Sequence, residues 1–245
     1  MKTVLTLFGT RPEIIKLAPI VWALEKRGSR LKTLNVCSSQ HTDLLRPFVA
    51  ELDIRIDEDL AVMTPSQTLA EVLARVVAAM GRLIDKTRPD IVLVQGDTTT
   101  AIGGAMAAFY ARVPVGHVEA GLRTMNRFSP FPEEMNRRLI TRVADLHFAA
   151  TPGNVATLLA EGVPKESIHL TGNPVVDTLK SVVSSTHPSD ALSSVLDQVA
   201  GKRLIVLTTH RRENFGTVMR DHLRALREFT ARHPDIGLVF PVHPN

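Results

Sequence analysis

Short apolar runs alternate with longer segments of helical periodicity along most of this sequence. The clearest run, Ile91-Val92-Leu93-Val94, predicts a buried strand, and the polar stretch after it opens a helix over 101–111. Further strands are predicted at 3–8, 31–37, 146–149 and 168–170, and further helices at 14–26, 67–86 and 151–161. Such alternation favours an α/β fold with a doubly wound parallel sheet, whose right-handed crossovers bring the carboxyl ends of all strands to one edge.

Two acidic residues follow predicted strands at this edge, which is where open α/β sheets bind ligands. Glu119 ends the apolar run 113–118. A carboxylate there is no helix cap and is costly to bury without a partner, so we interpret Glu119 as functional. Asp97 follows the strand at 91–94, and it either caps the next helix or faces the same edge as Glu119.

A second charged segment, 132–138, reads Pro-Glu-Glu-Met-Asn-Arg-Arg and predicts the start of a helix. Two interpretations stay open. Glu133 and Glu134 are spaced i,i+4 from Arg137 and Arg138, which suits surface ion pairs worth about 0.2–0.5 kcal/mol each. Alternatively, these carboxylates and guanidiniums lie beside the strand that ends at Glu119 and belong to a site.

The first predicted strand is followed by two cations in an unusual place. Thr10 and Glu13 fit a capping box at the start of a helix. Arg11 and Lys16 lie near the same helix end, where the macrodipole disfavours positive charge. A bound anion such as phosphate would resolve this conflict.

Composition excludes several classes of function. The net charge of +4 and an aromatic content of 4% lack the basic, aromatic-rich pattern of nucleic-acid binders. The one cysteine, Cys37, gives neither a disulfide framework nor a thiolate metal site. Asp57-Glu58-Asp59 has a D-x-D pattern but is predicted to be a solvated loop rather than a metal site. Neither the dinucleotide fingerprint nor the P-loop fingerprint occurs, and the sequence has no H-E-x-x-H or C-x-x-C motif.

The N-terminal apolar run is too short for a signal peptide, and no uncharged stretch reaches the ~18 residues of a membrane span, so a cytoplasmic protein with no membrane partner is expected. A Ser-rich stretch at 181–194 is the candidate boundary before a second βα unit, with strands at 203–208 and 236–240. A parallel sheet of two strands cannot bury both its faces, so either the second half packs on the first or the sequence is a fragment.

Six motifs carry a family resemblance. They are Phe-Gly-Thr-Arg-Pro-Glu at 8–13, Gln-Gly-Asp-Thr-Thr at 95–99, Gly-His-Val-Glu-Ala-Gly-Leu-Arg at 116–123, Pro-Glu-Glu-x-Asn-Arg at 132–137, Thr-Gly-Asn at 171–173 and Thr-His-Arg-Arg-Glu-Asn at 209–214. In order and spacing they resemble the motifs of the non-hydrolysing UDP-N-acetylglucosamine 2-epimerases. The resemblance implies two Rossmann-like domains of the glycosyltransferase B type. The first would span 1–175, and 176–245 would begin a C-terminal nucleotide-binding domain that is truncated here.

The same resemblance implies reversible C2 epimerisation of UDP-GlcNAc to UDP-ManNAc by elimination and re-addition of UDP, without cofactor, in a homodimer. Three alternatives stay open: a hydrolysing relative that releases ManNAc and UDP, a non-catalytic remnant that binds sugar nucleotides, and a retaining glycosyltransferase. In the family the second domain continues past a segment similar to 243–245 into a stretch that holds the nucleotide. If the molecule ends at Asn245, we expect little turnover.

Residues are assigned by matching the family motifs. The resemblance implies catalytic roles for Asp97, Glu119, Glu133 and His210, substrate binding by Arg11, Lys16, Arg137, Arg211 and Asn214, and an allosteric site at Gln40, His41 and Arg75. The chemistry suits these residue types, because a base must remove the C2 proton and an acid must return it on the other face. Carboxylates crowded in one cleft are expected to differ in pKa, which would separate these roles.

Overall fold

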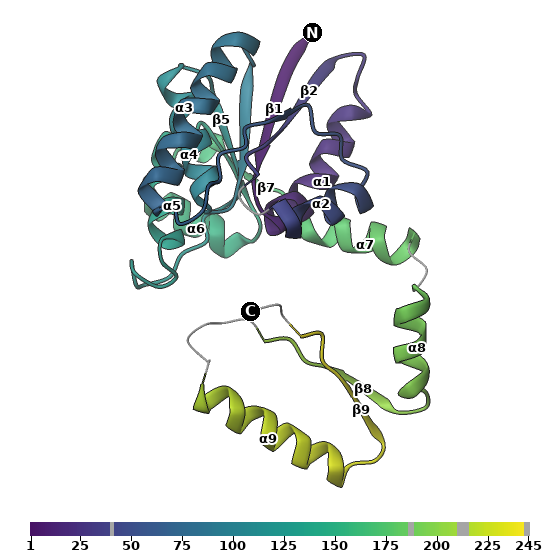
Figure 1. Cartoon of the computed structure of the whole chain (residues 1–245). Helices are drawn as coiled ribbons and strands as arrows, with labels where there is room; N and C mark the ends of the chain where they lie inside the picture. The colour runs from purple at the N-terminus through teal and green to yellow at the C-terminus, as the bar shows by residue number, and fades with distance from the viewer. Residues whose placement is uncertain (40–41, 186–188, 210–215, 243–245) are drawn as a thin grey trace. The chain divides into compact units, whose positions relative to one another are not determined.

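The computed structural model describes residues 1–39, 42–185, 189–209 and 216–242 (Figure 1). The chain divides into two compact units, 1–184 and 185–245. Each unit is described by itself below.

The first unit is built on a parallel sheet, which confirms the predicted α/β class. Among the described residues the sheet has seven strands in the order β3-β2-β1-β4-β5-β6-β7. The strands are β1 (Lys2–Phe8), β2 (Leu31–Cys37), β3 (Glu58–Asp59), β4 (Ile91–Gln95), β5 (Val115–Ala120), β6 (Leu146–Ala149) and β7 (Ile168–Leu170). The strand order reverses between β1 and β4, so the crevice outside their carboxyl ends is the topological switch point.

Helices cover both faces of this sheet (Figure 1). They are α1 (Arg11–Glu25), α2 (Thr42–Glu51), α3 (Leu69–Thr87), α4 (Thr99–Tyr110), α5 (Glu133–Val143), α6 (Pro152–Ala160) and α7 (Val175–Ser185), with a short 3₁₀ helix at Lys165–Ser167. Side chains alternate along β1, so Leu5 and Leu7 pack with α3 and α4 on one face while Phe8 packs with α1 and α2 on the other. Two apolar cores result, and they fix the strand ends that carry the polar motifs.

The D-x-D segment was predicted to be a solvated loop. Asp57 and Asp59 are exposed and Glu58 is half-buried, as expected of a solvated segment, but the loop assignment is wrong for two of the three residues. Glu58–Asp59 forms the edge strand β3, paired in parallel with Val36 and Cys37. Flanking hydrogen bonds explain the pairing: the Asp57 carboxylate accepts from the Asn35 N–H at 2.8 Å, and Asp59 Oδ1 accepts from the Ser39 hydroxyl at 2.6 Å. A strand of two residues has no apolar pattern by which sequence could reveal it.

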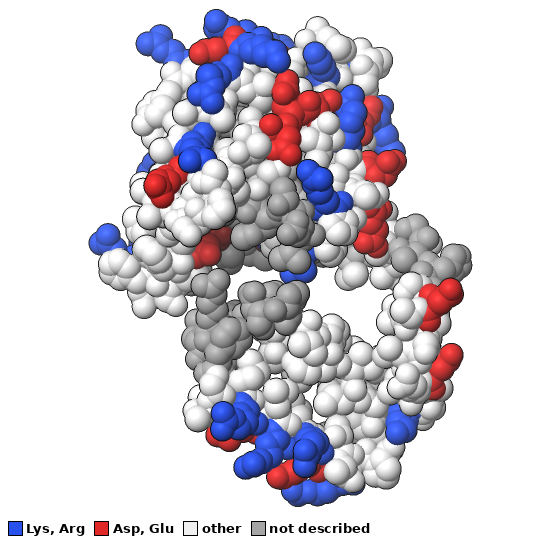
Figure 2. All heavy atoms as spheres, viewed as in Figure 1, with Lys and Arg blue, Asp and Glu red and all other residues white. Residues whose placement is uncertain are grey.

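The second unit contains α8 (Asp190–Gln198), β8 (Arg203–Val206), α9 (Thr217–Arg232) and β9 (Ile236–Val239). Within its described residues β8 and β9 form a parallel pair. Lys and Arg side chains gather over α9 in Figure 2, and this helix carries exposed arginines at 220, 224, 227 and 232. None of the helices in the described part of the chain is both long and apolar enough to span a bilayer.

Candidate active site in the first unit

A cavity of about 370 Å³ opens at the switch point of the first unit. Its wall comes from the start of α1, the turn after β4, the end of β5 and the start of α5. Four carboxylates line it: Glu13, Asp97, Glu119 and Glu133. The fold therefore brings together acidic residues that lie up to 120 positions apart in sequence, at the edge where ligands bind in such folds.

Glu119 sits at an irregularity in β5. The register with β6 shifts between Val118 and Ala120, and Glu119 has a φ of +66° in the left-handed region. Such bulges re-aim a side chain, and backbone strain of this kind often accompanies function. The carboxylate accepts hydrogen bonds from Lys16 Nζ at 2.5 Å and Gln95 Nε2 at 2.6 Å on one oxygen, and from Asn173 Nδ2 at 2.8 Å on the other.

The cations after β1 are only partly explained by a bound anion. Lys16 already has an anionic partner, because its ammonium pairs with Glu119. The sequence left Lys16 without an anionic partner, and Glu119 supplies one within the chain. Arg11 is exposed, and its guanidinium carbon lies 5.5 Å from the centre of the Phe48 ring. An anionic ligand remains the prediction for Arg11.

Glu13 does more than cap α1. One carboxylate oxygen accepts from the Gly9 and Thr10 N–H groups at 2.9 and 2.8 Å, as the capping box predicts. The other accepts from the Thr98 hydroxyl at 2.6 Å. Burial raises the pKa of Glu13, although these hydrogen bonds oppose the shift. The side chain is fully buried and ties the turn after β1 to the turn after β4.

Asp97 is not a helix cap, so that alternative is wrong. Thr98 caps α4 instead, with its hydroxyl accepting from the Ala101 N–H at 3.0 Å. Asp97 turns toward the cavity, and its Oδ2 lies 2.9 Å from Arg137 Nη2. Burial raises the pKa of Asp97, the charge of Arg137 opposes this, and the nearby Glu133 carboxylate adds to it. A protonated Asp97 is thus favoured relative to an ordinary aspartate.

Glu133 differs from the other three carboxylates of the cavity in the surroundings of one of its oxygens. Its Oε2 atom is buried and has no hydrogen-bond partner among the described residues. The sequence suggested an i,i+4 ion pair between Glu133 and Arg137. Among the described residues the Arg137 guanidinium instead pairs with Asp97 and Glu134. A buried carboxylate oxygen without a donor is available to take or share a proton.

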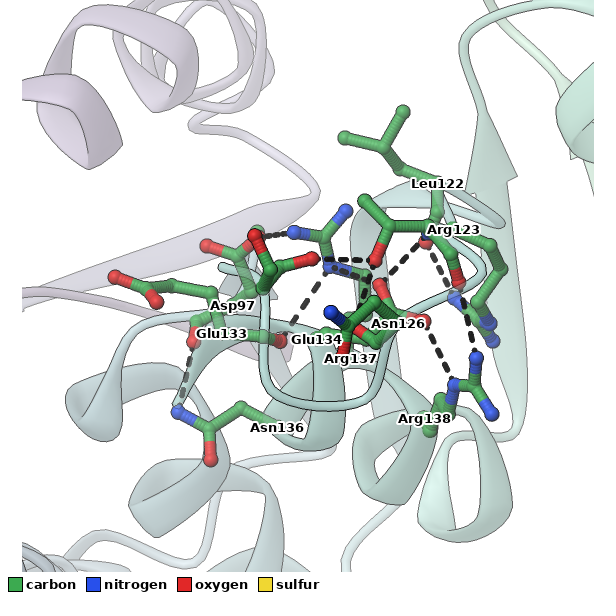
Figure 3. A network of polar contacts seen from close by, with 12 residues as sticks. Asp97, Leu122, Arg123, Asn126, Glu133, Glu134, Asn136, Arg137 and Arg138 are labelled. Carbon is green, nitrogen blue, oxygen red and sulfur yellow. Dashed lines mark hydrogen bonds and ion pairs between the residues drawn. The ribbon is translucent and has the colours of Figure 1, made fainter. Parts of the chain in front are cut away.

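Glu134 was missed as a buried residue. The predicted pair with Arg138 forms, at 2.7 Å, but the Glu134 side chain has an exposed fraction of 0% rather than lying on the surface. It also accepts from the Thr124 N–H at 2.9 Å and lies 3.6 Å from Arg137 Nε (Figure 3). Burial raises the pKa of Glu134, but the hydrogen bonds from Thr124 and Arg138 outweigh it, so the pKa is lowered overall. The i,i+4 spacing alone gave no sign of this burial.

The other predicted site residues fall into two groups. Gln40, His41, His210, Arg211 and Asn214 lie outside the described residues. Arg75 is exposed on α3, beside Glu71 of the same helix.

A doubly wound parallel sheet with a carboxylate-rich cavity at its switch point defines a Rossmann-like α/β protein with a site suited to proton transfer. The sequence profile of UDP-N-acetylglucosamine 2-epimerase matches residues 23–245. The UDP-N-acetylglucosamine 2-epimerase of Bacillus subtilis strain 168 is 44% identical over 244 residues, which cover 99% of this chain and 62% of the relative. The chain belongs to the UDP-N-acetylglucosamine 2-epimerase family.

Solved structures agree with this assignment. The Staphylococcus aureus MnaA–UDP complex is 42% identical with a TM-score of 0.91, covering 100% of this chain and 64% of that one. UDP-GlcNAc 2-epimerase from Neisseria meningitidis bound to UDP-GlcNAc is 36% identical with a TM-score of 0.88, covering 99% and 66%. The chain thus spans less than two thirds of the Bacillus and Staphylococcus proteins and shares their Rossmann-like fold of the glycosyltransferase B type.

Proposed function

We propose that the protein carrying this chain interconverts UDP-GlcNAc and UDP-ManNAc by inverting C2. The observation that carries the proposal is one cavity lined by carboxylates in unlike environments: Glu119 with three donors, Asp97 with one guanidinium, and Glu133 with a buried unpartnered oxygen. Family membership, and the relatives solved with UDP and UDP-GlcNAc, support the same substrate class.

The proposed reaction has two balanced halves. A carboxylate base takes the C2 proton, the electron pair forms a C1=C2 bond, and UDP leaves with the electrons of the C1–O bond. A diphosphate oxygen then adds back to C1 while C2 takes a proton on its opposite face. The base and the acid must flank the sugar. We assign the base to Glu133, because its Oε2 has no competing donor among the described residues, and the acid to Asp97, because burial favours its protonated form.

Charge develops on UDP as it leaves, and cations are proposed to stabilise it. Lys16 lines the cavity and pairs with Glu119, and Arg137 pairs with Asp97, which lines the cavity. We propose that Arg11, Arg211, Asn214 and His210 complete the diphosphate site, with His210 facing the reacting sugar. An allosteric role for Gln40, His41 and Arg75 is retained as a proposal, tested by whether added UDP-GlcNAc makes turnover sigmoidal.

The test is an assay in deuterium oxide on the protein as the gene encodes it, with the full natural chain. UDP-GlcNAc is supplied and the products are followed by NMR. We expect deuterium at C2 and an equilibrium of UDP-GlcNAc with UDP-ManNAc, both retaining UDP. Accumulation of free ManNAc would replace the proposal with the hydrolysing reaction. Transfer of the sugar to an added acceptor would point to a glycosyltransferase, and binding without C2 exchange to a non-catalytic protein.

The domain organisation is proposed separately. We propose that 1–175 form the catalytic Rossmann-like domain and that 176–245 begin a nucleotide-binding domain. Limited proteolysis is expected to cut first between 176 and 194, and cleavage first within 1–175 would contradict this.

We also propose a homodimer through the first unit, where Phe109 and Tyr110 at the end of α4 are 54% and 66% exposed. Light scattering would test it, with Tyr110→Asp expected to favour the monomer.

A further inference from the structure

His117 is a buried histidine that the reaction above does not use. It lies on β5 with an exposed fraction of 0%, and its Nε2 atom is 2.7 Å from the Gly96 carbonyl oxygen. A carbonyl oxygen only accepts hydrogen bonds, so Nε2 carries the proton. Its Nδ1 has no partner in the described part of the chain. Burial lowers the pKa of His117 to about 4, so the ring is neutral near pH 7.

The carbonyl that His117 holds belongs to the peptide that leads into Asp97. Gly96 has a φ of +69°, and its N–H donates to the Val118 carbonyl at 3.0 Å. On the other side of Asp97, Asn136 Nδ2 donates to the Asp97 carbonyl at 2.9 Å (Figure 3). The peptide planes before and after Asp97 are therefore both fixed by hydrogen bonds. Only the peptide before Asp97 has a glycine on its N-terminal side, and glycine has the widest choice of backbone angles, so this peptide plane has the greater need of a hydrogen bond to fix it.

We propose that His117 is a positioning residue, whose ring fixes the peptide between Gly96 and Asp97 and so directs the Asp97 carboxyl across the cavity toward the substrate. This inference rests on the proposed function. Without the ring, the Gly96 carbonyl would be buried without a donor, and the peptide would rotate to find one. Misplacement of a reacting group by about 1 Å is enough to cost of the order of 100-fold in rate.

His147 provides a matched control on the neighbouring strand. It is the β6 partner of His117 in the parallel register, its exposed fraction is 2%, and its Nδ1 also lacks a partner among the described residues. Burial lowers the pKa of His147 as well, and its hydrogen bond goes to the main chain of Ala144, which precedes β6. The two rings are thus both buried, but the His117 ring bonds to the Gly96 carbonyl and the His147 ring bonds to the main chain of Ala144.

The experiment compares His117→Leu, His117→Gln, His147→Leu and His147→Gln in the natural gene product. Gln places an amide nitrogen near the position of Nε2 and keeps a donor, whereas Leu removes it. For His117→Leu we expect kcat to fall about 10- to 100-fold, with KM for UDP-GlcNAc changed less than about 3-fold. His117→Gln is expected to recover most of the loss. Both His147 variants should keep kcat within about 3-fold while lowering Tm as much as the His117 pair.

Equal losses of kcat in His117→Leu and His147→Leu would overturn the proposal, because general loosening of the core would then explain both. Failure of His117→Gln to exceed His117→Leu in kcat would also overturn it. If His117→Leu does not fold, the wild-type protein still decides: nitrogen NMR of the histidine rings must find the proton of His117 on Nε2 at pH 7, and a proton on Nδ1 contradicts the geometry.

A readout independent of turnover separates this proposal from the proposed function. The amide resonance of Asp97 should move in His117→Leu and stay in place in His147→Leu. If the wild-type protein fails to exchange C2 while the Asp97 resonance responds only to His117, the epimerase function fails and the positioning role stands. If C2 exchanges but the resonance ignores His117, the positioning role fails alone.

Discussion

The two sides of the cavity treat the same chemical group in opposite ways. On one side Glu119 is supplied with donors from three different segments, namely α1, the end of β4 and the turn after β7. On the other side Asp97 has a single guanidinium partner, and Glu133 keeps a buried oxygen that nothing in the described chain contacts through a hydrogen bond.

The contrast shows how a fold can place the carboxylates that line one cavity in unlike surroundings. Donors favour the ionised form, whereas burial disfavours it, as the raised pKa of Asp97 illustrates. A site that must both remove and return a proton needs such a division.

The largest expected effect is on turnover. Glu133→Gln and Glu119→Gln should each lower kcat about 10²- to 10⁴-fold, because each removes a carboxylate that the proposed mechanism places against the sugar. UDP-ManNAc formation from UDP-GlcNAc measures this. Glu166→Gln, in the exposed 3₁₀ helix, is the matched control and should leave kcat within about 2-fold. If either site variant retains a tenth of the wild-type kcat, a catalytic role for that residue is contradicted.

The backbone on the Glu119 side should be less tolerant than an ordinary turn. Gly121 and Gly172 both have positive φ, at +86° and +80°. A Cβ at 121 would lie 2.4 Å from the Asn154 carbonyl oxygen, whereas one at 172 would meet nothing within 4 Å. Gly121→Ala should therefore lower the free energy of unfolding by about 2–5 kcal/mol, and Gly172→Ala by about 1–2 kcal/mol.

Urea unfolding followed by tryptophan fluorescence measures both changes. Trp22 is the one tryptophan among these 245 residues and belongs to α1, so within this sequence the signal reports the first unit. Equal losses at the two glycines would mean that Asn154 moves aside and that the close approach does not hold the loop.

The substitutions Glu119→Gln and Glu133→Gln should differ in their effect on stability. Glu119→Gln leaves the Lys16 ammonium without its anionic partner and should cost about 1–3 kcal/mol of unfolding free energy. Glu133→Gln replaces an unpartnered buried carboxylate oxygen by a neutral amide and should be neutral or stabilising. The same fluorescence measurement compares them. A loss of stability in Glu133→Gln matching that of Glu119→Gln would show that the two sides do not differ.

The finest contrast concerns pH. Arg137 is the main influence that opposes the raised pKa of Asp97. Its replacement in Arg137→Gln should raise the pKa of Asp97 further and move the corresponding limb of the kcat profile to higher pH. Arg138→Gln is the matched control, since Arg138 bonds to Glu134 and to the Thr124 carbonyl instead. A limb that stays in place in Arg137→Gln would assign it to another group.

Sequence predicted the frame of the fold better than its polar details. The predicted bounds of β2, β6 and β7 agree with the structure, and the strand at 91–94 is right to within one residue. The strand β4 was the clearest of them, because it is a short apolar run of the kind that forms buried parallel strands. Asp97 and Thr98 are adjacent residues that both cap helices well, so only the backbone decides between them.

Burial of charge was the main feature that sequence could not supply. Glu134 and Arg138 have the same spacing whether they face solvent or the sheet, and what buries Glu134 is the loop that returns Thr124 over it. The gathering of Asp97 and Glu119 at one edge followed from the topology, and the structure places both on one cavity. Their catalytic roles remain predictions.

Asn173 gives the Glu119 site a place in time as well as in space. It is the last of the donors along the chain and follows β7, the edge strand of the sheet. A chain is synthesised from its N-terminus, so the central strands β1, β4 and β5 are made before Asn173 is added. A nascent chain that stops short of residue 173 thus contains the strands of the sheet but lacks one of the three hydrogen-bond donors to Glu119. The set of donors to Glu119 is complete only when the edge strand β7 and the turn after it are in place.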